Sequence, residues 1–249
     1  MTVMDQNDKV QSLDVVSPFD GTLIRTLPLN DDADVERMVA TASRLFKERD
    51  GWLEHDERLE ILERLAKLVD AEAESFAKLI AQEGGKPLVD ARIEVARAVD
   101  GIRLAGKELS HVMRGTEIPM GHTAATRGRI AYTTMEPIGV VVAISAFNHP
   151  LNLIVHQVVP AVAVGCPVIV KPASSTPLNC LRFCELLAEA GLPDGWCQPV
   201  VCNNAVAETL VTDARLAFLT FIGSGRVGWN IRSKLAPGVR CALEHGGVA

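Results

Sequence analysis

The stretch IGVVVAISAFNHPLNLIVHQVVPAVAVGCPVIVKP, residues 138–172, places an apolar helical pattern between two short apolar runs. The runs IGVVVAI and PVIVKP are rich in β-branched residues, as strands are, and the segment between them is long enough for a helix. A strand, a helix and a second strand in this order form a βαβ unit, in which the two strands run parallel. This stretch therefore predicts a parallel sheet.

The same alternation continues toward the carboxyl end. Three more short apolar runs follow, separated by helical patterns. The runs are WCQPVVC, LAFLTFI and VRCALE, and the helical patterns that precede or separate them lie at 177–190, 204–212 and 226–236. Consecutive units of this kind build a parallel sheet that is covered on both faces. We predict an α/β fold with a five-stranded parallel, Rossmann-like dinucleotide-binding sheet.

The part of the chain that precedes this sheet is charged and helical. Residues 13–29 show a strand-turn-strand pattern around SPFDG, and Asn30, Asp31 and Asp32 are N-cap candidates for the first helix. A second helix is predicted through DERLEILERLAKLVDAEAESFAKLIAQE, ended by the following GGKP, and a third lies beyond it. The charge runs in these helices are typical of solvated faces. An amino-terminal helical layer on the sheet is expected.

Composition excludes several classes of function. The formal net charge is −6 and no run of Lys or Arg occurs, which argues against nucleic acid as a partner. No apolar run reaches the roughly 20 residues that span a bilayer, and the polar amino end lacks the apolar segment of a secretory signal. The six Cys include no C-x-x-C pair, which favours a reducing compartment. A cytoplasmic protein without membrane contact is expected.

A glycine pattern follows the strand LAFLTFI and opens a helix. Residues 223–228 read GSGRVG, so Gly223, Gly225 and Gly228 form G-x-G-x-x-G. Backbone N–H groups in such a loop can approach a phosphate, and the helix N-terminus favours negative charge. The alternative is a tight turn without a ligand.

Polar residues also stand at other strand ends. Lys171 ends PVIVK and is placed to donate to a ribose hydroxyl or a phosphate, whereas Ser174 and Ser175 could instead cap the next helix. Glu244 ends VRCALE about 20 residues beyond the glycine loop, a distance at which dinucleotide-binding units often carry an acid for the ribose. An acid at a strand end is also suited to be a general base. The spacing leaves both roles open.

Five motifs in order and in register give the chain a resemblance to the aldehyde dehydrogenase superfamily. They are MEPIGVVVAISAFNHPLNL, VIVKPASSTP, AGLPDGW, LTFIGSGRVG and LEHGG. The resemblance covers essentially the whole chain, but only the amino-terminal, cofactor-binding portion of such an enzyme. FNHP, in place of the commoner WNFP, resembles the branch that acts on small phosphorylated, phosphonate or hydroxylated aldehydes.

The resemblance implies a role for each motif residue. Asn148 would donate its side-chain amide to the oxyanion that forms when a thiolate attacks the aldehyde, and His149 would be a packing variant. Glu244 would be the general base for hydrolysis. Cofactor contacts are implied for Lys171, Ser174, Gly223, Ser224, Gly225, Val227 and Gly228. NAD-preferring members usually carry Glu where this chain has Ser174, so NADP is expected to be tolerated and a preference for it stays open.

The reaction implied is NAD(P)-dependent oxidation of an aldehyde to a carboxylic acid through a Cys thiohemiacetal and thioester. None of the six Cys stands in the GQ-x-C context of the family's nucleophile, so that Cys is expected beyond residue 249. The end at Ala249 is interpreted as a cut, and the isolated chain is expected to be inactive. A non-catalytic nucleotide-binding or interaction module and a CoA-acylating aldehyde dehydrogenase are the alternatives.

The resemblance also implies a division of the chain and an assembly. Residues 1–118 are assigned to the hairpin and helical part of the cofactor domain, 119–137 to an oligomerisation-type strand excursion, and 138–249 to the βαβ part. A homodimer or homotetramer is expected for the full-length protein. The partner expected at the site is a small-molecule aldehyde, and no metal site is expected.

Overall fold

The five strands predicted between residues 138 and 244 lie in one parallel sheet in the computed structural model, which describes residues 11–247. Their order in the sheet is β7-β6-β5-β8-β9. The strands are β5 (Val140–Ile144), β6 (Val168–Lys171), β7 (Cys197–Pro199), β8 (Leu216–Gly223) and β9 (Arg240–His245). The predicted fold class is confirmed. The polar amino end from which no secretory signal was predicted falls mainly in residues 1–10, outside the described residues.

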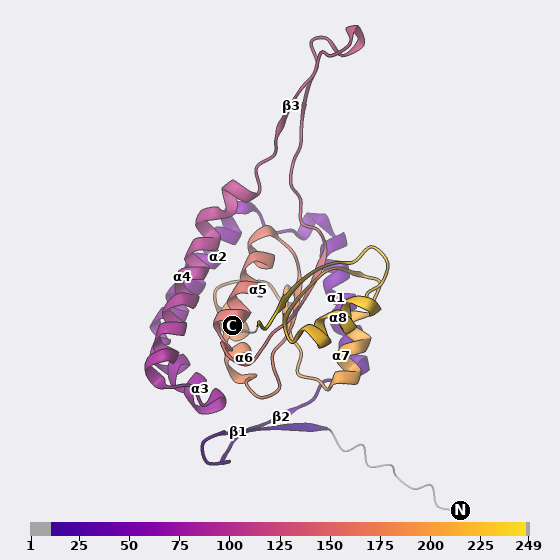
Figure 1. The fold of residues 1–249 in the computed structure, drawn as a ribbon. Helices are drawn as coiled ribbons and strands as arrows, with labels where there is room; N and C mark the ends of the chain where they lie inside the picture. The colour runs from indigo at the N-terminus through magenta and orange to yellow at the C-terminus, as the bar shows by residue number, and fades with distance from the viewer. Residues whose placement is uncertain (1–10, 248–249) are drawn as a thin grey trace, which may run out of the picture.

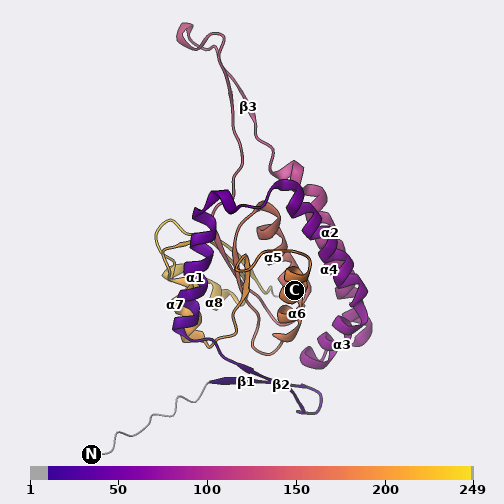
Figure 2. The same cartoon turned by 180° about the vertical axis from the view of Figure 1, so that it is seen from behind.

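Helices cover both faces of the sheet. Because successive side chains of a strand point to opposite faces, Val141 of β5 joins one apolar core while Val140 and Val142 join another. The first core contains α5 (Asn152–Val164) and α6 (Leu178–Glu189). The second contains α1 (Asp32–Lys47) and α7 (Asn204–Val211), with α8 (Gly225–Lys234) packed against its edge. Figure 2 shows α1 and α7 together on the face away from α5.

The amino-terminal helices are divided between the two sides. Only α2 (His55–Ala71), α3 (Ala73–Gly84) and α4 (Leu88–Val112) form the outer layer on α5 and α6 (Figure 1). The prediction of one continuous helix from DERLE to the GGKP stop is wrong, because the helix breaks at Glu72 between α2 and α3. No Gly or Pro stands there to signal a break. Instead the Glu72 carboxylate accepts two hydrogen bonds from Arg182 of α6, so a tertiary contact fixes the bend.

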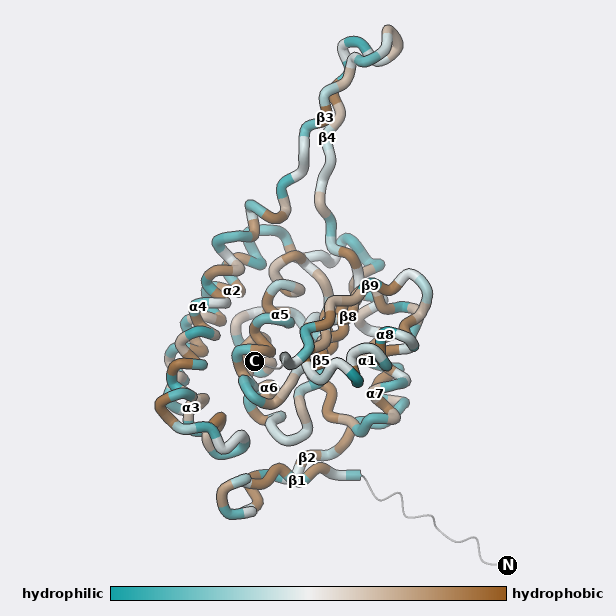
Figure 3. Tube along the Cα trace, viewed as in Figure 1, coloured by the Kyte–Doolittle hydropathy of each residue, from teal (hydrophilic) through white to brown (hydrophobic). Residues whose placement is uncertain are grey.

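Two hairpins extend from this body. The strands β1 (Ser12–Val16) and β2 (Leu23–Pro28) pair antiparallel beneath it, around the predicted SPFDG turn. The strands β3 (Glu117–Pro119) and β4 (Ile130–Tyr132) form a second hairpin that projects far from the sheet (Figure 1). Figure 3 shows hydrophobic residues concentrated in the central strands and mixed colouring along the outer helices. Within residues 11–247 no helix is long and apolar enough to cross a membrane.

Candidate functional site

The motif residues gather at one edge of the sheet, because the carboxyl ends of parallel strands point the same way. Asn148 follows β5, Lys171 ends β6, the GSGRVG loop follows β8 and Glu244 lies at the end of β9. Asn148 and Glu244 are exposed, whereas Lys171 is buried. The topological switch point of the sheet lies between β5 and β8. From β5 the strand order proceeds to β6 on one side, and from β8 it proceeds to β9 on the other.

A hollow of about 270 Å³ opens beside these strand ends, between α7 and α8. Its floor is formed by the ends of β5, β6 and β8, and its walls are mostly apolar with a few polar groups, as in small-molecule sites. The lining residues are Ile144, Lys171, Asn204, Ala207, Glu208, Val211, Phe221, Val227, Asn230, Ile231 and Lys234. Of the predicted site residues, Lys171 and Val227 are brought together here, and the other predicted residues are not part of this lining.

Lys171 is the polar centre of this hollow. Its side chain belongs to the floor and the residue is only 8% exposed. The Lys171 carbonyl accepts a hydrogen bond from Ser145 N at 3.0 Å, which pins the strand end. Among residues 11–247, the Lys171 ammonium has no hydrogen-bond or ion-pair partner. The residue is otherwise buried and its ammonium faces an open hollow without a protein partner, so this ammonium is suited to meet a hydroxyl or an anion there.

The glycine loop is a helix N-terminus packed against β9. Ser224 is the N-cap of α8, and its hydroxyl accepts a hydrogen bond from Val227 N at 3.4 Å. A Cβ at Gly228 would lie 2.5 Å from Nε2 of His245, and one at Gly223 would lie 2.6 Å from the Phe221 ring. Neither glycine has a positive φ. Close packing therefore requires glycine at these positions, which the sequence pattern did not reveal.

The Asn148 loop rests on a buried carboxylate that the sequence analysis missed. Glu94 of α4 has a fully buried side chain, and its Oε1 accepts hydrogen bonds from Leu151 N (2.9 Å) and Asn152 N (3.1 Å) at the start of α5. Its Oε2 lies 2.5 Å from the Lys86 ammonium, which also approaches His149 Nδ1 at 3.0 Å. From the loop before α5, His149 therefore makes a polar contact with the Lys86–Glu94 pair, which the sequence pattern did not reveal.

A second buried glutamate caps the next helix. Glu83 of α3 is 2% exposed, and its carboxylate accepts from Leu178 N (2.8 Å) and from the backbone and side-chain nitrogens of Asn179. Burial raises the pKa of Glu83 above its usual value against these hydrogen bonds. The helix begins at Leu178 with Pro177 as its cap, so the alternative that Ser174 and Ser175 cap it is wrong.

The spacing of both glutamates from the buried residues of their helices is a sequence signal of their burial. Glu94 follows Ala91 by three residues and precedes Ala98 by four, so it falls within the buried stripe of α4. Glu83 follows Phe76 by seven residues and Ile80 by three in the stripe of α3. An acidic residue in the buried face of an amphipathic helix indicates a buried carboxylate with hydrogen-bond or ion-pair partners, since charged residues are seldom buried without them.

The profile of the aldehyde dehydrogenase family matches residues 4–249. The chain belongs to the aldehyde dehydrogenase family. The resemblance inferred from the five motifs is thereby confirmed.

Similar proteins cover 81–98% of this chain. It is 38% identical over 202 residues to a 3-sulfolactaldehyde dehydrogenase of Priestia megaterium, which is 81% of this chain and 42% of that protein. Aldehyde dehydrogenase 21 from Physcomitrella patens, solved with succinate, superposes with a TM-score of 0.91 at 32% identity over 98% of this chain and 50% of that one. Glyceraldehyde-3-phosphate dehydrogenase GapN from Methanocaldococcus jannaschii, solved with NADP, gives 0.87 at 30% identity over 95% and 51%. The chain spans about half the length of the curated relatives it matches.

Glu244 occupies the end of the edge strand of this family member. It pairs in register with Ile222 of β8, and among the described residues its carboxylate has no hydrogen bond or ion pair. Its side chain is exposed, and its neighbour His245 faces α8, where it stacks edge-on against Trp229. An unpaired carboxylate at this edge suits a base that takes a proton from water, and it also suits an acceptor for ribose hydroxyls.

The cysteines of this chain are free thiols, of which Cys166, Cys180, Cys184 and Cys202 are buried. Burial raises the pKa of Cys166 and of Cys202. Hydrogen bonding to Cys180 raises the pKa of Cys184, and hydrogen bonding to Cys184 raises that of Cys197. Protonated, buried thiols are poor nucleophiles. Between residues 11 and 247, no group of His, Cys, Asp or Glu is arranged to hold a metal ion.

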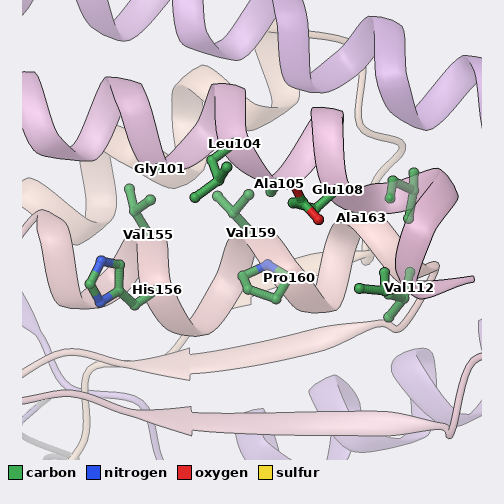
Figure 4. Close-up of a pocket in the computed structure, with 12 residues that line it drawn as sticks. Gly101, Leu104, Ala105, Glu108, Val112, Val155, His156, Val159, Pro160 and Ala163 are labelled. Atoms are coloured by element: carbon green, nitrogen blue, oxygen red, sulfur yellow. The ribbon is translucent and has the colours of Figure 1, made fainter.

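A larger hollow, of about 510 Å³, lies away from the strand ends between α4 and α5. Figure 4 shows Val155, Val159 and Pro160 of α5 facing Leu104 and Ala105 of α4 across it. Its lining is largely apolar. Because it lacks a converging set of polar groups, it does not have the character of a dinucleotide site.

Proposed function

We propose that the chain is the cofactor-binding portion of an NAD(P)-dependent aldehyde dehydrogenase that oxidises an aldehyde to a carboxylic acid. The observation that carries the proposal is the hollow between α7 and α8, with the unpaired ammonium of Lys171 in its floor. Family membership and the NADP in the structure of the similar GapN support the choice of cofactor. When bound, the nicotinamide cofactor supplies the hydride acceptor.

The residues present fit an adenosine half of such a cofactor. The apolar walls contributed by Val211, Val227 and Ile231 suit a flat aromatic base, while Lys171 suits the ribose hydroxyls or a phosphate next to it. The start of α8 lies beside this hollow, so its N–H groups favour the negative charge of a pyrophosphate.

Asn148 and Glu244 are proposed to serve the aldehyde side. Asn148 is exposed at the end of β5, where its amide can donate to an oxygen that becomes negative during attack by a thiolate. Glu244, at the same edge of the sheet and unpaired among the described residues, would take a proton from the hydrolytic water. The attacking Cys is proposed to lie beyond residue 249, since none of the six Cys stands in the GQ-x-C context and the pKa is raised for Cys166, Cys184, Cys197 and Cys202.

The substrate proposed is a small aldehyde with a hydroxyl, phosphoryl or phosphonyl group. The FNHP motif supports this proposal in the sequence, and His149 brings a polar ring to the Asn148 loop. Similar proteins include a 3-sulfolactaldehyde dehydrogenase and a lactaldehyde dehydrogenase, whose substrates carry a hydroxyl or an acid beside the aldehyde.

A homodimer or homotetramer is proposed for the full-length protein, with the β3–β4 hairpin in its interface. Ile130 and Tyr132 of β4 are largely exposed, as is Met135 just beyond it. A projecting two-stranded hairpin with such side chains is marginal alone and gains from a partner.

Binding of the cofactor tests the proposal without requiring turnover. In the full-length protein, Lys171→Met should weaken binding of NADPH and NADH, measured by the fluorescence of the reduced nicotinamide. The loss should be about 10- to 100-fold, since a charge-assisted hydrogen bond contributes about 1.5–3 kcal/mol. Lys67→Met, at an exposed position of α2, is the matched control and should leave both affinities unchanged. Equal affinities for the two variants would contradict the assignment of the hollow. Free acid as the product, rather than an acyl-CoA, would separate hydrolysis from the acylating reaction.

A further inference from the structure

The side chain of Gln157 bridges the two strands at the switch point of the sheet. Gln157 lies on α5 and is 5% exposed. Its Nε2 donates to the carbonyl of Ile144 in β5 at 3.0 Å and to the carbonyl of Thr220 in β8 at 3.1 Å. The same nitrogen lies 3.2 Å from Thr220 Oγ1. One amide therefore contacts both halves of the sheet.

The two strands need such a bridge, because they part at this point. Beyond Ile144 the chain continues its pairing with β6, through the hydrogen bond from Ser145 N to Lys171 O. Beyond Phe221 the other strand continues with β9, through the hydrogen bond from Gly246 N to Gly223 O. The ladder between β5 and β8 ends at the pair Ile144 and Phe221. Figure 3 labels β5, β8 and α5 in this region.

Each parted strand leads into one half of the proposed site. β5 leads to Asn148, the proposed oxyanion donor, and β8 leads to the GSGRVG loop, the proposed cofactor loop. Reaction between an aldehyde and a cofactor depends on their relative placement, and a misplacement of about 1 Å can cost about 10²-fold in rate. A link between the strand ends therefore sets the geometry between the two ligands.

We propose that Gln157 is a positioning residue that holds the aldehyde half and the cofactor half of the site in register. It acts through the strand ends and touches neither ligand, since its Nε2 is occupied by Ile144 and Thr220 and its Oε1 is buried in the protein. This inference rests on the proposed function. It predicts that loss of the Gln157 amide separates turnover from binding.

The test compares full-length wild type with Gln157→Leu, which keeps the apolar stem and removes the donor. The turnover number of Gln157→Leu should fall by about 10- to 100-fold. The dissociation constant of NADPH, measured by its fluorescence, should stay within about threefold of the wild-type value, because the hollow between α7 and α8 is intact. The matched control is Gln198→Leu, which removes another amide that donates to a main-chain carbonyl, that of Met38, at 2.9 Å. Its turnover should match that of wild type.

A second variant keeps the inference testable should Gln157→Leu fold poorly. Gln157→Lys has a slightly longer side chain whose ammonium can donate to Ile144 O, Thr220 O and Thr220 Oγ1, and it removes an amide oxygen that has no partner among the described residues. Its turnover should exceed that of Gln157→Leu or, where that variant does not fold, lie within about threefold of wild type. Normal turnover by Gln157→Leu, or a rise in the NADPH dissociation constant that matches the loss of turnover, would overturn the inference. Absence of aldehyde oxidation by wild type would instead refute the proposed function.

Discussion

Replacing Glu94 with alanine should destabilise the full-length protein by about 3–5 kcal/mol, the usual cost of removing one partner from a buried ion pair. Glu94 has a side chain with no exposed surface, and its partner Lys86 is 15% exposed. The change leaves Leu151 N and Asn152 N without the acceptor that they meet at 2.9 and 3.1 Å. Each buried N–H left without a partner costs about 1–3 kcal/mol, so these two groups alone explain most of the loss.

Urea unfolding followed by circular dichroism measures this loss, and two further variants locate its cause. Glu94→Gln keeps an oxygen for the two N–H groups and removes only the charge, so its cost should be smaller, about 1–2 kcal/mol. Glu74→Ala removes an exposed carboxylate that accepts two hydrogen bonds from Arg92 at 2.9 and 2.8 Å, and it should cost less than about 1 kcal/mol. A loss for Glu94→Ala no larger than that for Glu74→Ala would refute the capping role.

Three other predictions concern the site and the second buried glutamate. Asn148→Ala should lower the turnover number by about 10²–10³-fold, the typical effect of losing one oxyanion donor, with cofactor affinity unchanged; near-normal steady-state turnover would mean that Asn148 only shapes the loop. Ser174→Glu should lower the ratio of kcat/KM with NADP to kcat/KM with NAD at least about tenfold, because the carboxylate repels a 2′-phosphate. An unchanged ratio in steady-state kinetics with both cofactors would mean that Ser174 is not part of the cofactor site. Burial raises the pKa of Glu83, so the folded state binds the Glu83 proton more tightly than the unfolded state does. The stability of wild type relative to Glu83→Gln should therefore be greatest below the unfolded pKa of 4.5. It should fall as pH rises through the folded pKa. Melting temperatures of both proteins between about pH 4 and 8 check this, and a difference that grows with pH would contradict it.

The parallel sheet was predictable because its signal is local. Each strand is a short apolar run, and the helices between the strands are long enough to cross over, so pattern alone fixes the class of fold. The edge at which Asn148, Lys171 and Glu244 stand follows from the direction of parallel strands. Their chemical roles did not follow from pattern and came from the resemblance, and those roles stay predictions.

The features that escaped prediction depend on residues far apart in the sequence. The bend at Glu72 is fixed by Arg182, which is 110 residues away, and the caps of α5 and α6 come from Glu94 and Glu83 across the layers. Local propensity would continue the helix at Glu72, and the tertiary contact overrides it. The need for glycine at position 228 of α8 likewise arises from His245 on β9.

The caps of the helices suggest how charge is distributed at the proposed site. Buried glutamates cap α5 and α6, whereas the neutral Asn203 and Ser224 cap α7 and α8. A phosphate placed at the start of α5 or α6 would meet a carboxylate, although a helix N-terminus otherwise favours an anion. At the start of α8 no acid stands in the first turn, and the hollow holding Lys171 lies alongside. The caps thus favour α8 for the pyrophosphate of the proposed cofactor, which leaves the Asn148 loop to the aldehyde.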